Sequence, residues 1–215
     1  MLSAEICVTC TLKNSTNHNP VPMQGRCVQE IIKESIRVKE KIQADTRIVQ
    51  TIAEAAQTLV QCFQNGGKVL LCGNGGSAAD AQHIAAELSG RFMLNRPPLF
   101  AEALHVNTSY LTATANDYAF DQVYSRLIEA KGRPDDVLIA LSTSGNSPNV
   151  VLAAKIARKM KMITIGLTGI RKARLDPYCA VLIKVPSDNT ARIQEAHILI
   201  GHIICELVEQ KLFGK

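Results

Sequence analysis

The chain has 215 residues, of which 47% are hydrophobic and 20% charged, and its formal net charge is +5. This composition is typical of one globular domain with a sizeable core. Aromatic residues make up only 4% of the chain and the basic residues are scattered, which argues against a nucleic-acid surface built on base stacking. No apolar run reaches the roughly 20 residues that a membrane span needs.

The N-terminus and the cysteines indicate where the protein is located. The N-terminus lacks the basic-then-apolar layout of a secretory signal, so the cytoplasm is the expected location. Seven cysteines, an odd number spread through the chain, predict reduced thiols. Cys7 and Cys10 have metal or redox spacing, but no second pair follows, which disfavours a zinc site there. Residues 1–25 are predicted to be a flexible tail, and residues 26–215 a single domain.

Hydrophobic periodicity predicts the elements that follow. Apolar residues at helical spacing indicate two amphipathic helices between residues 28 and 63, with a capping break at Asp45 and Thr46. Their apolar faces exceed what one small sheet can cover, which predicts that they pack between subunits. Strands are expected at residues 68–72, 99–104, 136–141, 162–167 and 180–185. Helices are expected at residues 77–88, 107–130 with an interruption near Asn116, 150–161 and 190–212.

Strands that alternate with helices in this way predict an α/β fold, a three-layer sandwich with a central parallel sheet. Ligands of such sheets bind at the carboxyl ends of the strands, where two polar loops lie in this sequence. The first loop is CGNGGS at residues 72–77, which leads from a buried strand into an alanine-rich helix. Its glycines allow close approach to free N–H groups at the helix start, which indicates an anion site.

The second loop is STSGNS at residues 142–147, which precedes another helix. Its hydroxyl and N–H groups suit a phosphate, and they suit a helix cap equally well. His83 and Glu87 are four residues apart on the first helix and project from one face. Such a pair is either a solvated pair or part of a metal or acid–base site.

These motifs resemble the sugar isomerase domain family, and within it the phosphoheptose isomerases, over residues 28–213. The motifs that carry the resemblance are CGNGGS with Asp80, His83 and Glu87, then Asn116 and Asp117, then STSGNS, and finally ARIQE at residues 191–195 with His197 and His202. The resemblance implies a flavodoxin-like sheet and a homotetramer with sites at subunit boundaries. It also implies conversion of sedoheptulose 7-phosphate to D-glycero-D-manno-heptose 7-phosphate, the first step of heptose synthesis for lipopolysaccharide or related glycans.

The resemblance further implies roles for individual residues. Glu87 and His202 correspond to the catalytic pair. One zinc ion per subunit is expected on His83, Glu87, Gln194 and His202. The expected substrate contacts are Asn74, Gly75, Gly76, Ser77, His83, Glu87, Asn116, Asp117, Ser142, Thr143, Ser144, Ser147 and Gln194.

The chemistry agrees with these residue types. Moving a carbonyl between C2 and C1 requires a base for a carbon-bound proton and a group that polarises the oxygens of the enediolate. Two histidines, a glutamate and an amide oxygen form a possible zinc set. A glutamate bound to zinc is a poorer base, however. The two roles of Glu87, metal ligand and base, therefore conflict if they fall in the same step. Gln194 and His202 are separated by about 12 Å of rise and about 80° of rotation on an ideal helix. They meet one metal only if their side chains lean together or if different subunits supply them.

Two other functions are weighed against the isomerase. A branch of the same family, resembling the factor that binds the replication initiator protein, keeps the fold as a binding module but tends to lose parts of the metal and catalytic set. This chain keeps Ser144, Glu87 and His202. A sugar-phosphate-sensing regulator would need an attached DNA-binding domain, for which the tail is too short. His197 fits a structural role as well as a functional one. The basic turn at residues 171–174 is expected to be solvated, and residues 168–171 depart from the paired glycines of many relatives.

Overall fold

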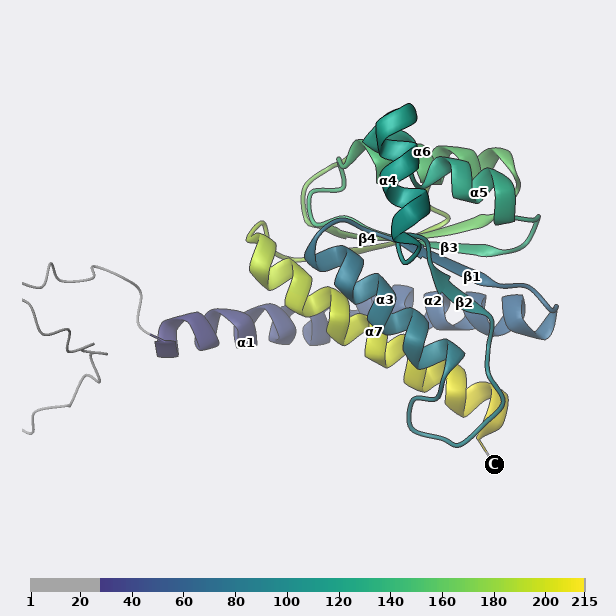
Figure 1. Ribbon diagram of the computed structural model, residues 1–215. Helices are drawn as coiled ribbons and strands as arrows, with labels where there is room; N and C mark the ends of the chain where they lie inside the picture. Colours follow the sequence, from purple (N-terminus) through teal and green to yellow (C-terminus); the bar gives the residue numbers. More distant parts are fainter. Residues whose placement is uncertain (1–27, 215) are drawn as a thin grey trace, which may run out of the picture.

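Five short apolar runs form one parallel sheet in the computed structural model, which describes residues 28–214 (Figure 1). The strands are β1 (Val69–Cys72), β2 (Ala101–Ala103), β3 (Val137–Leu141), β4 (Ile163–Gly169) and β5 (Val181–Val185). Their order in the sheet is β2-β1-β3-β4-β5, and every neighbouring pair is parallel. This is the flavodoxin-like order of a doubly wound sheet. The five predicted strands and the fold class are confirmed. The predicted tail at residues 1–25 lies outside the described residues.

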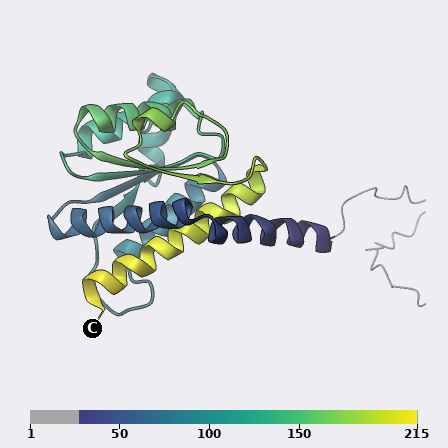
Figure 2. The same cartoon turned by 180° about the vertical axis from the view of Figure 1, so that it is seen from behind.

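Helices cover both faces of the sheet, which gives the predicted three layers (Figures 1 and 2). One face carries α2 (Thr46–Gln64), α3 (Gly76–Ser89) and α7 (Thr190–Phe213), and the other carries α4 (Thr108–Asp117), α5 (Ser125–Lys131) and α6 (Pro148–Lys159). Successive side chains of a strand point to opposite faces. Val69 and Leu71 accordingly join the first core, whereas Leu70 and Cys72 join the second. Within residues 28–214, no helix is both long and apolar enough to cross a membrane.

The first two helices meet at the predicted break. Asp45 separates α1 (Val28–Ala44) from α2, and its carboxylate accepts hydrogen bonds from the N–H groups of Arg47 (2.9 Å) and Ile48 (3.3 Å), which caps α2. α1 extends away from the sheet in both views. Val38 and Ile42 are its only buried residues. Its exposed apolar residues are Val28, Ile31, Ile32 and Ile36.

Both polar loops lie at the carboxyl edge of the sheet, as expected. β1 ends before the glycine loop, and its neighbour β3 ends before the serine loop. The side chains of Asn74 and Asn149 join the two loops through a reciprocal pair of hydrogen bonds of 2.8 and 2.9 Å. Asn149 is 1% exposed, so this amide pair is a fixed part of the interior. The two loops are therefore held side by side although 75 residues separate these asparagines.

Candidate active site

The start of α3 leaves its backbone N–H groups free of side-chain caps. Gly75 occupies the cap position with φ 55° and ψ −122°, and no side chain among residues 28–214 caps the helix there. This positive φ is a conformation that residues with a Cβ rarely adopt, which explains the glycine. The N–H groups of Ser77 and Ala78 donate to the carbonyls of Asn74 and Gly75 at 3.0 Å each, so backbone turns occupy part of this first turn, where an anion would be attracted. The structure thus confirms the uncapped helix start that the sequence predicts.

Gln194 lies against the start of α3. A Cβ at Gly76 would collide with the Gln194 side-chain amide, so the glycine is what allows the amide to approach the helix. Gln194 is half-buried and lies near the start of α7, eight residues before His202. Gly76 and His83 are seven residues apart on α3, which corresponds to about 10 Å along the axis. Within one chain the Gln194 amide therefore borders the glycine loop, and its place in a metal shell stays a prediction.

His83, Glu87 and His202 form a cluster, hereafter the His–Glu–His cluster. The Nε2 atoms of the two histidines are 3.0 Å apart, and Nε2 of His83 lies 3.1 Å from Oε1 of Glu87. All three donor atoms lie within 4.8 Å of one another. The side chain of His83 is 50% exposed and that of Glu87 25% exposed, so the cluster is open to solvent at its outer side. Two helices from distant parts of the chain supply it.

A close helix crossing brings the two histidines together. Gly201 on α7 faces Ile84 on α3, and a Cβ at Gly201 would lie 2.5 Å from Cδ1 of Ile84. The missing side chain lets the helices approach at this point. His202 directly follows the glycine and His83 directly precedes the isoleucine, so the two imidazoles flank the point of closest approach.

The cluster fits a zinc ion by donor type and spacing. Zinc in proteins takes imidazole nitrogen and carboxylate oxygen at about 2.0–2.2 Å, and catalytic sites often combine two histidines and a glutamate with one open position. Donor atoms around such an ion lie about 3–3.5 Å apart, close to the 3.0 and 3.1 Å between neighbouring donors here. The three side chains are therefore of the types that would hold a zinc ion.

The serine loop presents hydroxyl groups at the start of α6. Oγ of Ser142 and Oγ of Ser147 are 3.0 Å apart, and Oγ of Ser144 accepts a hydrogen bond from the N–H of Asn146 at 3.1 Å. Ser147 holds the cap position of α6 without a side-chain cap bond from any residue in the described part of the chain. The hydroxyl groups are therefore not used as a helix cap, which favours the phosphate site over the capping alternative.

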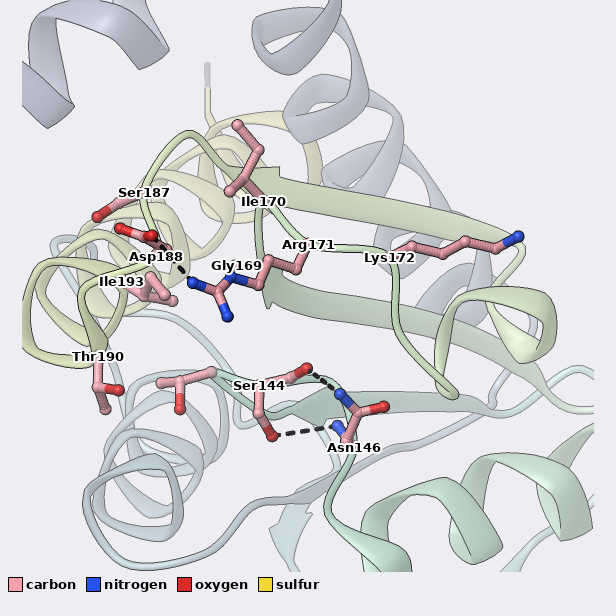
Figure 3. A pocket seen from close by; sticks show the side chains of 11 residues that line it. Ser144, Asn146, Gly169, Ile170, Arg171, Lys172, Ser187, Asp188, Thr190 and Ile193 are labelled. Carbon is pink, nitrogen blue, oxygen red and sulfur yellow. Dashed lines mark hydrogen bonds and ion pairs between the residues drawn. The ribbon is translucent and has the colours of Figure 1, made fainter.

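A cavity of about 250 Å³ opens beside this loop (Figure 3). Thr143 and Ser144 form one wall, the loops after β4 and β5 form the other, and Thr190 and Ile193 of α7 close one side. Arg171 points across the cavity toward Asp188, with 3.1 Å between Nη2 and Oδ2, whereas Lys172 points away. The basic side chains of the predicted turn are thus exposed, and two of them, Arg171 and Lys172, also line the cavity.

Asn116 and Asp117 end α4, where both are exposed. The side-chain amide of Asn116 donates to Oδ1 of Asp117 at 2.9 Å. Neither is among the described residues that line the cavity. Their contact with the sugar stays a prediction.

Three residues with a direct part in this geometry were missed by the sequence analysis. Asn149 pairs with Asn74. The hydroxyl of Tyr124 donates to the carbonyl of Gly73 at 2.5 Å, which holds the start of the glycine loop in place. The ring of Phe92 stacks on that of His202, with 5.5 Å between centroids and 25° between planes. None of the three belongs to a periodic pattern or a local motif, so only their long-range contacts identify them.

His197 of α7 lies in the interior of the protein. It is wholly buried, and neither ring nitrogen has a hydrogen-bond partner among residues 28–214. Burial lowers the pKa of His197 to about 4, which the nearby backbone of Thr168 opposes only in part. Cys72, at the end of β1, is also buried, and burial raises the pKa of its thiol to about 12, which disfavours the nucleophilic thiolate.

Comparisons with known proteins agree with this geometry. The family model described as SIS domain matches residues 32–169. The chain is 49% identical over 188 residues to a phosphoheptose isomerase of Clostridium acetobutylicum, covering 87% of this chain and 96% of the relative. It is 47% identical to that of Aneurinibacillus thermoaerophilus, with 86% and 94% covered. The solved phosphoheptose isomerase of Neisseria gonorrhoeae superposes with a TM-score of 0.80 at 46% identity, with 85% of this chain and 97% of that chain covered.

The buried His197 predicts a specific pH dependence of stability. Because its folded-state pKa of about 4 lies below the unfolded value of about 6.5, the unfolded chain binds the extra proton first as the pH falls. The stabilisation is complete above pH 6.5 and is lost between pH 6.5 and 4, by about 3 kcal/mol. In urea unfolding at pH 7 and pH 4, the wild type should lose this amount relative to His197→Met. Parallel stability profiles of the two proteins would show that His197 is not buried in its neutral form.

Proposed function

The chain belongs to the sugar isomerase (SIS) domain family and, within it, to the phosphoheptose isomerases, and from this we infer that it interconverts sedoheptulose 7-phosphate and D-glycero-D-manno-heptose 7-phosphate. It is an aldose–ketose isomerase that acts in heptose synthesis. The observation that best supports this function is the His–Glu–His cluster on α3 and α7. Of these two helices, α3 begins at the glycine loop, which has no side-chain cap. A cytoplasmic location stays a prediction.

The reaction needs two proton movements. From ketose to aldose, a base removes a proton from C1, the enediolate forms, and a proton returns at C2, while the hydroxyl proton passes from O1 to O2. We assign the carbon-bound proton to the carboxylate of Glu87 and the oxygen-bound proton to the imidazole of His202. Because an atom bound to zinc is a poor proton acceptor, each side chain would act through the carboxylate oxygen or ring nitrogen that the metal leaves free. Both side chains are partly exposed, as a group that must reach substrate requires.

The rest of the substrate is assigned to the two polar loops. Ser142, Thr143, Ser144 and Ser147 would hold the phosphate through hydroxyl and N–H groups at the start of α6. The glycine loop would contact the sugar through Asn74, Gly75, Gly76 and Ser77. The amide pair between Asn74 and Asn149 supports this division, because it fixes the two loops relative to each other.

We propose zinc as the metal of the cluster, one ion per subunit, held by His83, Glu87 and His202. When bound, zinc would supply a Lewis acid that stabilises negative charge on the substrate oxygens. Gln194 is the fourth proposed ligand. Because its amide lies against Gly76 at the start of α3, it would reach the cluster only if its side chain moves or if a second subunit supplies it.

The non-catalytic binding module is the weaker alternative. It would have no use for three donor side chains that converge within 4.8 Å, and relatives near 48% identity over most of their length carry the isomerase name.

The first prediction is the reaction itself. Purified protein with zinc should convert sedoheptulose 7-phosphate to the aldose, measured by coupling to the kinase that consumes the product. Glu87→Gln should lower kcat by about 10²–10⁴-fold, because the amide cannot accept the carbon-bound proton. Glu129→Gln, on the exposed side of α5, is the matched control and should keep wild-type activity. Absence of turnover in the zinc-supplied wild type would refute the isomerase and favour the binding module.

The second prediction concerns Gln194. An amide is neither acid nor base near neutral pH and offers only ligation or hydrogen bonding. If Gln194 ligates zinc, Gln194→Ala should lower zinc occupancy and activity together, while the fold stays intact by circular dichroism. Full zinc content by elemental analysis together with reduced turnover would instead make Gln194 a substrate contact.

The third prediction is a homotetramer. Val28 is 71% exposed, Ile32 52% and Ile36 47%, so the apolar stripe of α1 is uncovered in a single chain. Burying this stripe in a helical bundle between subunits would remove it from water. Light scattering at micromolar concentration should give four times the chain mass of 23.4 kDa. A stable monomer would contradict the proposal, and Ile32→Glu with Ile36→Glu should dissociate the assembly.

A further inference from the structure

Arg96 and Glu209 form an ion pair that is almost wholly inside the protein. Nε of Arg96 lies 2.9 Å from Oε1 of Glu209, and 1% of each side chain is exposed. Arg96 belongs to the loop between α3 and β2, which passes the C-terminal end of α7 in both views (Figures 1 and 2). Removing two charges from water is costly unless their remaining polar atoms are also paired. The partners of those atoms show what the pair holds in place.

The guanidinium of Arg96 binds the end of α3. Its Nη2 donates to the carbonyl of Glu87 at 2.8 Å, and its Nη1 donates to the carbonyls of Leu88 (2.7 Å), Gly90 (3.1 Å) and Pro97 (3.1 Å). The last carbonyls of a helix have no donor within the helix, and a positive charge there suits the helix dipole. Arg96 thus caps α3 and holds Glu87, whose carboxylate belongs to the His–Glu–His cluster, through its backbone.

The carboxylate of Glu209 binds the loop that follows α3. Its oxygens accept hydrogen bonds from the N–H groups of Phe92 (2.9 Å), Met93 (2.8 Å) and Leu94 (3.0 Å). Burial alone would raise the pKa of Glu209, but these N–H groups and Arg96 together hold it below its ordinary value. Glu209 is therefore a fixed anion in the working pH range.

This loop reaches the second histidine of the cluster. Phe92, held by Glu209 through its N–H, stacks its ring on the imidazole of His202. His202 lies seven residues before Glu209 on α7, two helical turns along the same side. The same ion pair is thereby connected to Glu87 through α3 and to His202 through Phe92.

We propose that Arg96 and Glu209 are positioning residues for the His–Glu–His cluster. They lock the end of α3 to α7 so that the two helices present their donor atoms at metal-binding distance before any ion arrives, and Phe92 sets the orientation of the His202 ring. Partners behind the ligands commonly change metal affinity about 10–100-fold when they are lost. The inference rests on the proposed function in that zinc is taken as the ion.

A second buried ion pair provides a matched control. Nζ of Lys68 lies 2.6 Å from Oδ2 of Asp136, and their side chains are 12% and 4% exposed. Asp136 also accepts hydrogen bonds from the N–H groups of Lys68 (3.0 Å) and Arg133 (2.8 Å). The chemistry matches that of Glu209, but this pair joins the starts of β1 and β3, at the edge of the sheet opposite the polar loops.

The test compares zinc affinity with stability in the full chain. Arg96→Lys keeps the charge and loses the forked donor, Glu209→Gln keeps the shape and loses the charge, and Phe92→Leu keeps the bulk and loses the ring. Zinc Kd is measured by competition with a chromogenic chelator, and stability by the unfolding midpoint of the metal-free protein. The three variants should raise the zinc Kd about 10–100-fold. Asp136→Asn should lower the midpoint as much as Glu209→Gln does, yet leave the Kd within about twofold of the wild type.

Kinetics adds a second readout. Misplaced catalytic side chains lower kcat more than they raise KM, and the conservative Arg96→Lys should retain more of both affinity and kcat than Arg96→Met. Wild-type zinc affinity in folded Arg96→Lys and Glu209→Gln would overturn the inference and leave the pair as a stabilising contact. If those variants do not fold, the Phe92→Leu variant decides. Unchanged zinc affinity in Phe92→Leu would overturn the inference. Reduced zinc affinity without loss of stability would support it.

The zinc measurement uses no substrate, so it separates this inference from the proposed reaction. A wild-type chain that binds zinc without isomerase activity would remove the reaction and leave the comparison of variants decisive. A wild-type chain that binds no zinc would overturn the inference.

Discussion

The crossing of α3 and α7 at Gly201 and Ile84 is the contact on which the site depends. A methyl group at position 201 would lie 2.5 Å from Cδ1 of Ile84, so the glycine lets the two helices approach here without displacing that side chain. His83 and His202 are the sequence neighbours of the contact, and their Nε2 atoms lie 3.0 Å apart. Since protein interiors are close-packed, a larger residue at position 201 would force the Ile84 side chain or the helices beside the imidazoles to move. Helix packing and ligand geometry are therefore one constraint in this protein.

The parallel sheet fixes the other half of the site. Because β1 and β3 are neighbours, their carboxyl ends place the glycine loop and the serine loop side by side. The buried amide pair of Asn74 and Asn149 then ties the loops together, and the Tyr124 hydroxyl supports the first of them. Hydroxyl groups and glycine backbone gather at this edge, whereas His83 and Glu87 lie further along α3. One helix thus connects the glycine loop, which has no side-chain cap, with the His–Glu–His cluster.

Local sequence patterns predicted the elements well because burial determines them. The apolar run at β1 is buried on both faces, and Asp45, at the predicted break, caps α2. Neighbouring residues alone were enough to predict both features. The family motifs likewise selected His83, Glu87 and His202, which the structure brings together.

The contacts that complete the site could not be predicted in the same way. Asn74 pairs with a residue 75 positions away, and Glu209 with one 113 positions away. No periodicity of 2 or 3.6 residues carries such information, because it arises from the order of strands and the crossing of helices. Arg171 illustrates the same limit: its exposure followed from the basic turn, but its position at the cavity depends on where the loop after β4 meets the serine loop.

The central claim is that two imidazoles and a carboxylate from α3 and α7 bind zinc. X-ray absorption at the zinc edge of the loaded, full-length protein tests it most directly. The account predicts a first shell of nitrogen and oxygen only, with the multiple scattering of two imidazoles, reduced to one in His83→Ala. Sulfur in the first shell, as Cys7 and Cys10 would supply, or an unchanged spectrum in His83→Ala, would contradict it.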